Sequence, residues 1–167
     1  MMNTHSIEED DIVINLIAET QGEIYELAYE MGYDMNDFSN KYLPSDFCHD
    51  EMDALYSVFQ VDFGSLCLEY VLKEFQEKNI GVKKSKVDYV SYSPKWVGEM
   101  YRQLFFSLKL YSSDLCKLIP FEGVAKASIE LEECELEEAV LILTDKYKKQ
   151  IKGGQEETNC IDEDIPW

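Results

Sequence analysis

The stretch SPKWVGEMYRQLFFSLKLY (residues 93–111) decides the fold class, because it joins a helix start signal to a helical period. A serine oxygen can cap free backbone N–H groups, and a proline such as Pro94 suits the first helical position. Apolar residues then recur every three or four positions along one face, at Val97, Tyr101, Leu104, Phe105 and Leu108. We therefore predict that this segment is the central helix of an all-α domain.

The same period continues on the N-terminal side of this segment. We predict helices over residues 8–31, 35–43, 46–60 and 63–81. Their expected end signals are a glycine at the end of the first and last helices and an Asp or Ser cap before the middle two, namely Gly32, Gly81, Asp34 and Ser45. The whole first half is thus predicted to be helical.

On the C-terminal side we predict two short helices, from Ser112 or Ser113 to Ile119 and from Pro120 to about Ser128, and a longer one over 133–152 that closes on Gly153-Gly154. Residues 82–92 alternate briefly between polar and apolar side chains, which predicts either a short strand or an extended linker. The predicted organisation is a single compact helical domain over residues 1–152, built from several amphipathic helices, and a flexible acidic tail over 153–167.

Composition predicts a soluble globular protein of the cytoplasm. The 167 residues are 46% hydrophobic, and no apolar run is long enough for a membrane span. The five cysteines form no CxxC pair, and the N-terminus lacks the basic and apolar regions of a signal peptide. These features predict a reduced, cytoplasmic protein.

The net charge of −19 is unevenly distributed along the chain. Residues 1–80 hold 18 acids and 3 bases, residues 81–152 hold 11 and 12, and residues 153–167 hold 5 acids and no base. The negative electrostatic field of these acids disfavours direct binding to nucleic acid or an anionic membrane and attracts basic proteins. One local cluster of lysines could still contact nucleic acid directly: Lys83, Lys84, Lys86 and Lys95.

Motifs for catalysis or cofactor binding are missing from the sequence. No Gly-rich phosphate loop, GxSxG or HExxH occurs, and Arg102 is the single arginine. His49 and Asp53 lie four residues apart and could touch one metal ion, but two ligands do not make a site. We expect no metal, no cofactor and no enzymatic activity; an enzyme whose site is assembled from scattered residues is the alternative.

The C-terminal sequence DEDIPW resembles the acidic C-terminal tip of bacterial single-stranded-DNA-binding proteins, which typically reads Asp-Asp-Ile-Pro-Phe. The resemblance implies that the last aromatic enters an apolar pocket on a replication or repair protein while the acids face a basic rim. Carried over by position, Trp167 is the anchor, Ile165 and Pro166 shape it, and the steering acids are Asp162, Glu163 and Asp164. The departure is Trp in place of Phe, and the alternative is a solubilising tail whose Trp167 folds back onto its own domain.

Through FSNKYLPSDFC and YSPKWVGEMYRQL, the body resembles small helical proteins of bacterial mobile elements and toxin–antitoxin neighbourhoods. We therefore expect an interaction module that binds and inhibits a basic nucleic-acid-handling protein such as a nuclease, of the anti-CRISPR, anti-restriction or antitoxin type, with DNA mimicry as one means. The alternative is an adaptor recruited to DNA replication or repair proteins through its tail. The acids expected on the binding face are Glu8, Glu9, Asp10, Asp11, Glu19, Glu23, Glu26, Glu30, Asp34, Asp37, Asp46, Asp50, Glu51 and Asp53, and Glu19, Glu23, Glu26 and Glu30 are the main candidates.

Overall fold

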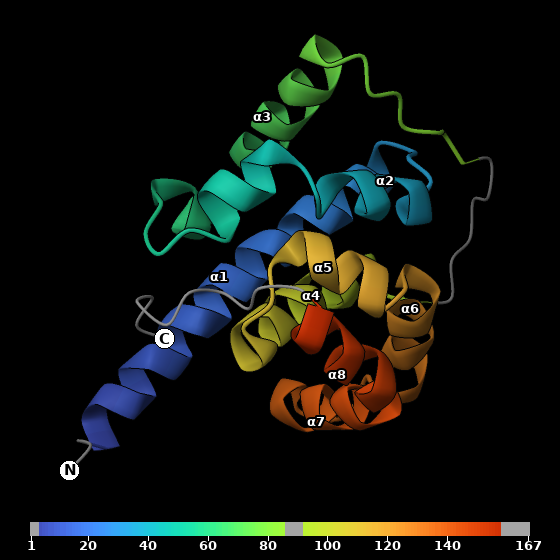
Figure 1. Ribbon diagram of the computed structural model, residues 1–167. Coiled ribbons are helices and arrows are strands. Elements are labelled where there is room, and N and C mark those ends of the chain that lie inside the picture. The colour runs from blue at the N-terminus through green and yellow to red at the C-terminus, as the bar shows by residue number, and fades with distance from the viewer. Residues whose placement is uncertain (1–3, 86–91, 158–167) are drawn as a thin grey trace.

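The computed structural model describes residues 4–85 and 92–157, and this part of the chain is all-α, as predicted (Figure 1). The helices are α1 (Thr4–Glu30), α2 (Met35–Tyr42), α3 (Gly64–Glu77), α4 (Pro94–Leu108), α5 (Ser112–Leu118), α6 (Phe121–Glu130), α7 (Leu136–Lys146) and α8 (Lys148–Glu157), with a π-helix, η1 (Cys48–Met52), and a 3₁₀-helix, η2 (Val58–Val61). Within the described residues, β pairing is limited to one bridge between Tyr33 and Lys84. None of the described helices is long and apolar enough to cross a membrane.

Helices α1 and α4 form the central antiparallel pair, which confirms the predicted role of residues 93–111. Gln21 Nε2 donates to the Gly98 carbonyl at 2.9 Å, and Gln103 Nε2 donates to Asn15 Oδ1 at 2.7 Å. The backbones approach closely at Gly98, where an added Cβ would lie 2.7 Å from the Gln21 carbonyl oxygen. Glycine is therefore required at this crossing.

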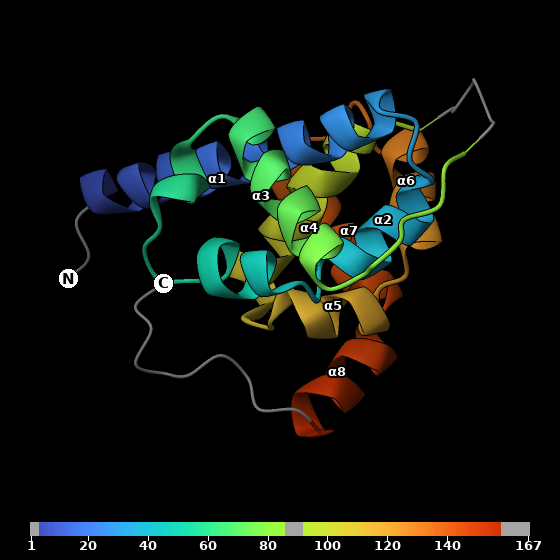
Figure 2. The same ribbon diagram turned by 90° about the horizontal axis from the view of Figure 1, so that it is seen from above.

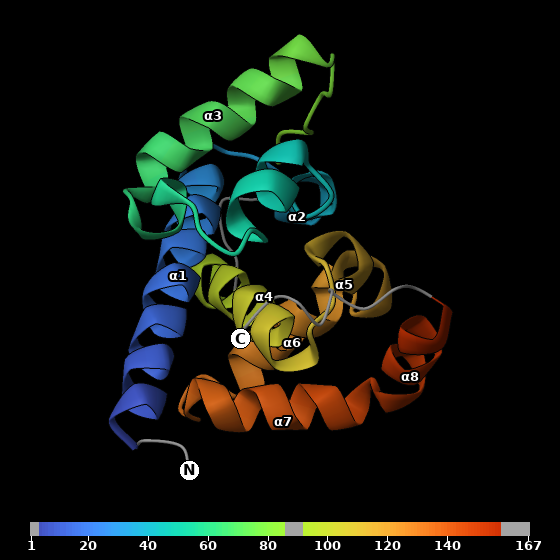
Figure 3. The same ribbon diagram turned by 60° about the vertical axis from the view of Figure 1, so that its left-hand side comes forward.

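The remaining helices surround this pair. Helices α2 and α3 lie on one side and α7 and α8 on the other, with α4 between them (Figure 3). Seen from above, α8 lies at the edge of the molecule opposite α1 (Figure 2). The core between α1 and α2 is aromatic: Tyr25 meets Phe38 and Tyr42 edge-on, with ring centroids 5.8 and 5.6 Å apart. The chain thus buries one continuous core.

Most of the predicted end signals are confirmed. Ser93 Oγ accepts a hydrogen bond from the Trp96 N–H at 3.1 Å, and Asp34 Oδ1 accepts one from the Asp37 N–H at 3.1 Å. Gly32 follows α1 with φ of 88°, a left-handed conformation that glycine adopts without strain. Helix α3 ends at Glu77 rather than near Gly81, since Asn79 with φ of 55° already turns the chain.

The predicted single helix over residues 46–60 is wrong, because residues 46–52 are helical but residues 53–57 are not, and only the short η2 follows. Ser45 Oγ does accept from the Cys48 N–H at 3.1 Å, but only the π-helix follows before the chain leaves helical geometry. The cause is tertiary, because the next residue, Asp53, turns inward to Arg102 and Gln60 bonds the Met52 and Ala54 carbonyls. Hydrogen bonds to distant side chains replace those of a continuous helix.

The predicted helix over 133–152 is also corrected, because it is two helices that meet at Tyr147. Gly153 and Gly154 lie inside α8 and do not start the tail. A Cβ on Gly154 would lie 2.5 Å from a methyl carbon of Leu118, so this glycine permits close packing on α5. Residues 158–167, including the DEDIPW sequence, lie outside the described residues.

A fully buried arginine connects the interior to segment 48–53. Arg102 Nη1 donates to Asp53 Oδ1 at 2.6 Å and to the Met52 carbonyl at 3.1 Å, and Nη2 donates to Gln21 Oε1 at 2.7 Å. Ser112 donates two further hydrogen bonds to the Asp53 carboxylate, from its N–H at 2.9 Å and from its hydroxyl at 2.6 Å. Every charge in this cluster is paired, as buried charges require.

Burial acts to lower the pKa of Arg102, but the Asp53 carboxylate and the neighbouring Cys48 and Tyr42 together outweigh it and raise that pKa. The guanidinium therefore stays charged inside the protein. It ties together α1, the end of η1 and the start of α5, because Gln21 lies in α1, Asp53 directly follows η1 and Ser112 begins α5. The single arginine of the chain is thus a structural hub.

Candidate interaction surface

The segment between η1 and α3 exposes an unusual number of large apolar side chains. Tyr56 is 84% exposed, Val58 74%, Val61 61% and Phe63 76%, and Leu55 is exposed as well. Isolated apolar residues on a surface are normal, but a contiguous group of this kind marks interaction surfaces in soluble proteins. This segment is therefore the strongest interaction candidate among the described residues.

Internal hydrogen bonds hold this segment in place. Ser57 caps η2 by accepting from the Phe59 N–H at 3.2 Å, and Gln60 Oε1 accepts from the Ser57 N–H. Gln60 is buried and donates to the Met52 carbonyl, which also accepts from Arg102. The exposed apolar residues are thus carried by a segment that is tied to the core.

A first hollow of about 270 Å³ lies between α1 and the end of this segment. Its apolar walls are Leu16, Val61 and Phe63, and its acids are Glu19, Glu23 and Asp62. Glu23 Oε2 accepts a hydrogen bond from the Gly64 N–H at 3.0 Å and so fixes the start of α3 against α1. A Cβ on Gly64 would lie 2.4 Å from the Cβ of Glu23, so glycine is required for this approach.

A second hollow of about 330 Å³ lies on the other side of η2, between η1 and α3. Phe47, Phe59 and Tyr70 supply its aromatic walls. Its acids come from η1, α3 and the residues beside them: Asp46, Asp50, Glu51, Glu74 and Glu77. We call the two hollows and segment 55–63 between them the acidic–apolar face.

The four main candidate acids lie on α1, and two of them belong to this face. Glu19 is exposed and Glu23 half-buried in the first hollow, whereas Glu26 and Glu30 are exposed beyond it. Burial raises the pKa of Glu99 on α4, and Glu19 and Glu26 raise it further while Lys95 opposes them. Glu99 therefore adds a carboxylate to this side of α1.

The other predicted acids do not form one surface. Asp53 is buried against Arg102, so its assignment to an exposed negative face is wrong. Asp34 and Asp37 lie at the start of α2, and Asp11 lies beside a hollow between α1 and α7. Asp46, Asp50 and Glu51 line the second hollow. The side chains of Glu8, Glu9 and Asp10, and the tail candidates Asp162, Glu163, Asp164, Ile165, Pro166 and Trp167, lie outside what the structure describes.

The metal-ligand pair considered from the sequence is not assembled. His49 is exposed, with its ring 5.2 Å from that of Tyr111, whereas Asp53 points into the core. Across residues 4–85 and 92–157, no group of three or more His, Cys, Asp or Glu side chains could hold a metal ion. Burial raises the pKa of Cys48 and that of Cys67 to about 12, so both thiols stay protonated at neutral pH.

Sequence reasoning missed the apolar half of this face. Tyr56, Val58 and Phe63 were assigned to helices, although the run VFQVDFG does contain a signal in Asp62 and Gly64, which interrupt the helical period. The contribution of Glu74 and Glu77 was also missed, because only the fold brings α3 beside η1.

Comparisons of this chain with protein family models, curated proteins and solved structures found no match.

Proposed function

We propose that the protein is an interaction module that binds and inhibits a basic nucleic-acid-handling protein, and that the acidic–apolar face is its binding surface. The observation that carries this proposal is the combination on one side of the molecule of exposed apolar residues with carboxylates. Three acids line the first hollow and five line the second, against one lysine in the lining, Lys73. Beside the second hollow, Lys78 pairs with Asp46 and Glu74, so Asp50, Glu51 and Glu77 are the acids there without a lysine partner among the described residues. A basic partner with apolar contact residues has the complementary chemistry.

The two kinds of residue contribute differently to binding. A few residues near the centre of an interface, often aromatic ones, supply most of its binding energy. Phe63 and Tyr56 have the exposure that such anchors need. Carboxylates around them raise the association rate with a cationic partner and favour it over anionic ones. Binding on this face is therefore expected to be specific and sensitive to salt.

Inhibition would follow from competition for the partner's basic surface. A protein that binds nucleic acid presents lysines and arginines to phosphates, and carboxylates can occupy the same positions. The charge of −15 over residues 1–80 supports such a competition, since it extends well beyond the two hollows. No catalytic step is required for this activity.

The test begins with a pull-down from a bacterial lysate, followed by kinetic measurements with the partner it identifies. Phe63→Ser should weaken the complex by tenfold or more, because the loss of one anchor corresponds to at least 1.4 kcal/mol. Glu19→Lys with Glu77→Lys should slow association and flatten its salt dependence. Glu23 is left unchanged, because it holds Gly64.

Matched controls lie on other sides of the molecule. Leu141→Ser removes an apolar residue of similar exposure on α7, and Glu130→Lys reverses a charge at the end of α6. These variants should bind like the original protein. The proposal is contradicted if both pairs of variants act alike, or if the partner's nucleic-acid activity is unchanged by saturating amounts of this protein.

The adaptor alternative makes a different prediction for the tail. If Trp167 is a terminal anchor and its carboxylate is part of the ligand, Trp167→Ala and an added glycine after Trp167 should each weaken capture by roughly tenfold. Capture that depends on these changes but not on Phe63 would favour the adaptor over the inhibitor. Neither change should alter thermal stability in that case.

A further inference from the structure

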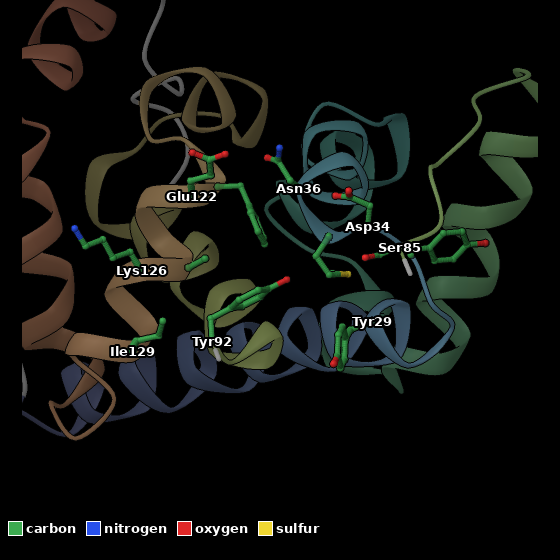
Figure 4. Close-up of a pocket in the computed structure, with 12 residues that line it drawn as sticks. Tyr29, Asp34, Asn36, Ser85, Tyr92, Glu122, Lys126 and Ile129 are labelled. Carbon is green, nitrogen blue, oxygen red and sulfur yellow. The ribbon is translucent and has the colours of Figure 1, made fainter. Parts of the chain in front are cut away.

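A third hollow, of about 410 Å³, lies away from the acidic–apolar face, where the C-terminal end of α1 meets α2 and α6 (Figure 4). Its walls are largely aromatic and include Tyr29, Tyr92 and Phe121. Met35 and Ile129 add aliphatic surface. A concave, mostly apolar site with a few polar groups is the usual form of a small-ligand site.

Two of the aromatic rings meet at a right angle. The centroids of Tyr92 and Phe121 are 5.6 Å apart, with an interplanar angle of 85°. Burial, together with Asp34 and Tyr29, raises the pKa of Tyr92 to about 12, so its hydroxyl stays protonated at neutral pH. Perpendicular rings of this kind present the electron-rich face of at least one ring to a cation that enters the corner.

The charged groups at this hollow are arranged for a cation. The Asp34 carboxylate points into the hollow, and the Lys126 amino group points away from it (Figure 4). Asp34 uses Oδ1 to cap α2, and within the described part of the chain no hydrogen bond involves Oδ2. A second carboxylate, that of Glu122, belongs to the same lining.

The protein itself already places an ammonium on one ring of this lining. Lys84 Nζ lies 3.8 Å from the centroid of Tyr33 and donates to the Met31 carbonyl at 3.0 Å. Tyr33 also stacks on Phe38, so its ring already contacts both an ammonium and another aromatic ring. The aromatic corner of Tyr92 and Phe121 has no such cation within the described residues.

We propose that this hollow binds an organic ammonium group on a short aliphatic chain. The cation would lie between the Asp34 carboxylate and the Tyr92 ring, and the aliphatic chain would pack on Phe121, Met35 and Ile129. An anion is disfavoured there by Asp34, by Glu122 and by the net charge of −19. The site is independent of the proposed function, because none of its residues belongs to the acidic–apolar face.

Two sources share this chemistry, a lysine side chain of another protein and a free polyamine. The probes are therefore Nα-acetyl-lysine methylamide and putrescine, with n-butanol as the uncharged analogue, titrated into the full-length ¹⁵N-labelled protein and followed by NMR. Both amines should shift resonances around Asp34, Tyr92 and Phe121 and saturate, whereas n-butanol should bind at least fivefold more weakly. Tighter binding of one amine identifies its source, and either outcome supports the site.

Two variants test the contacts. Asp34→Asn keeps the side-chain oxygen that caps α2 but removes the charge, and it should weaken amine binding by about tenfold. Tyr92→Leu should weaken it by about fivefold through loss of the ring face. Glu130→Gln removes one charge from α6 outside the hollow and should have no effect. If Glu130→Gln and Asp34→Asn weaken binding equally, or if n-butanol binds as well as the amines, the proposal is overturned.

Discussion

Replacing Arg102 by methionine should destabilise the protein more than any surface substitution. Methionine fills similar space without charge, so Asp53 would stay buried with Ser112 and the weak Cys48 thiol donor, at 3.9 Å, as its remaining side-chain partners and with no cation. Removing one partner of a buried ion pair costs about 3–5 kcal/mol. A domain of this size loses about 2–4 °C of melting temperature per kcal/mol, so the expected decrease is roughly 6–20 °C. Urea unfolding and a thermal melt followed by circular dichroism would measure both quantities.

The same substitution should loosen the acidic–apolar face. Arg102 and Gln60 donate to one carbonyl, that of Met52, so loss of the guanidinium removes a constraint on the segment that carries Phe63. Amide hydrogen exchange should accelerate over residues 52–63 before it accelerates in α4. Exchange that rises equally everywhere would show that the arginine stabilises the domain without selectively fixing this segment.

A double substitution tests the reasoning. Arg102→Met with Asp53→Leu should recover a large part of the lost stability, because replacing a buried pair by apolar groups is often neutral. Lys117→Met removes an exposed charge on α5 and should change stability by less than about 0.5 kcal/mol. A cost of less than about 1 kcal/mol for Arg102→Met, or a double variant less stable than the single one, would contradict a stabilising buried ion pair.

The raised pKa values of Glu99 and Cys48 and the close approach at Gly98 each give a further test. The raised pKa of Glu99 means that its ionised carboxylate is less favourable in the folded protein than in the unfolded chain. Glu99→Gln should therefore raise the free energy of unfolding by up to about 1 kcal/mol at pH 7. At pH 4 the gain, measured by denaturation, should be smaller or absent. Burial raises the pKa of Cys48 to about 12. The contribution of this neutral thiol to stability should therefore be complete below the unfolded thiol pKa of about 8.5 and should fall as pH rises towards 12, by up to about 1.4 kcal/mol per pH unit. Cys48→Ala should show a shallower fall. Gly98→Ala should cost about 1–3 kcal/mol in urea unfolding, because its Cβ would meet the backbone of α1, whereas Gly153→Ala, with open space around it, should be neutral or slightly stabilising. Equal effects of the two glycine substitutions would contradict the close approach at the crossing.

The sequence predicts helices well where local signals and burial agree. Ser93 and Asp34 are caps in both the sequence and the structure, and Gly32 ends α1 as expected. The predictions fail where a distant side chain competes with the helix. Segment 46–60 has a helical pattern, but Arg102 lies 49 positions from Asp53 in sequence and no local pattern announces their pairing.

The candidate surface was predicted in part, and for the same reason. Glu19 and Glu23 could be chosen from the sequence because helical spacing places them on one side of α1. Their apolar neighbours Val61 and Phe63 come from 38 or more positions later, and only the tertiary structure brings them together. Composition could identify an acidic protein, but it could not separate the acids that surround apolar groups from those that only face solvent.

The buried arginine and the exposed apolar segment are structurally linked, because Arg102 and Gln60 donate hydrogen bonds to the same carbonyl, that of Met52. An exposed run of apolar residues on a loose loop would be a liability, since it could contact any other apolar surface. Segment 55–63 is held by the Ser57 cap, by Gln60 and, through Met52, by Arg102. A surface held in advance loses less conformational entropy on binding, so more of its contact energy appears as affinity. In the binding role that we propose, this anchoring holds Phe63 in one position, and a charged, fully bonded arginine provides several directed bonds where an apolar side chain would provide none.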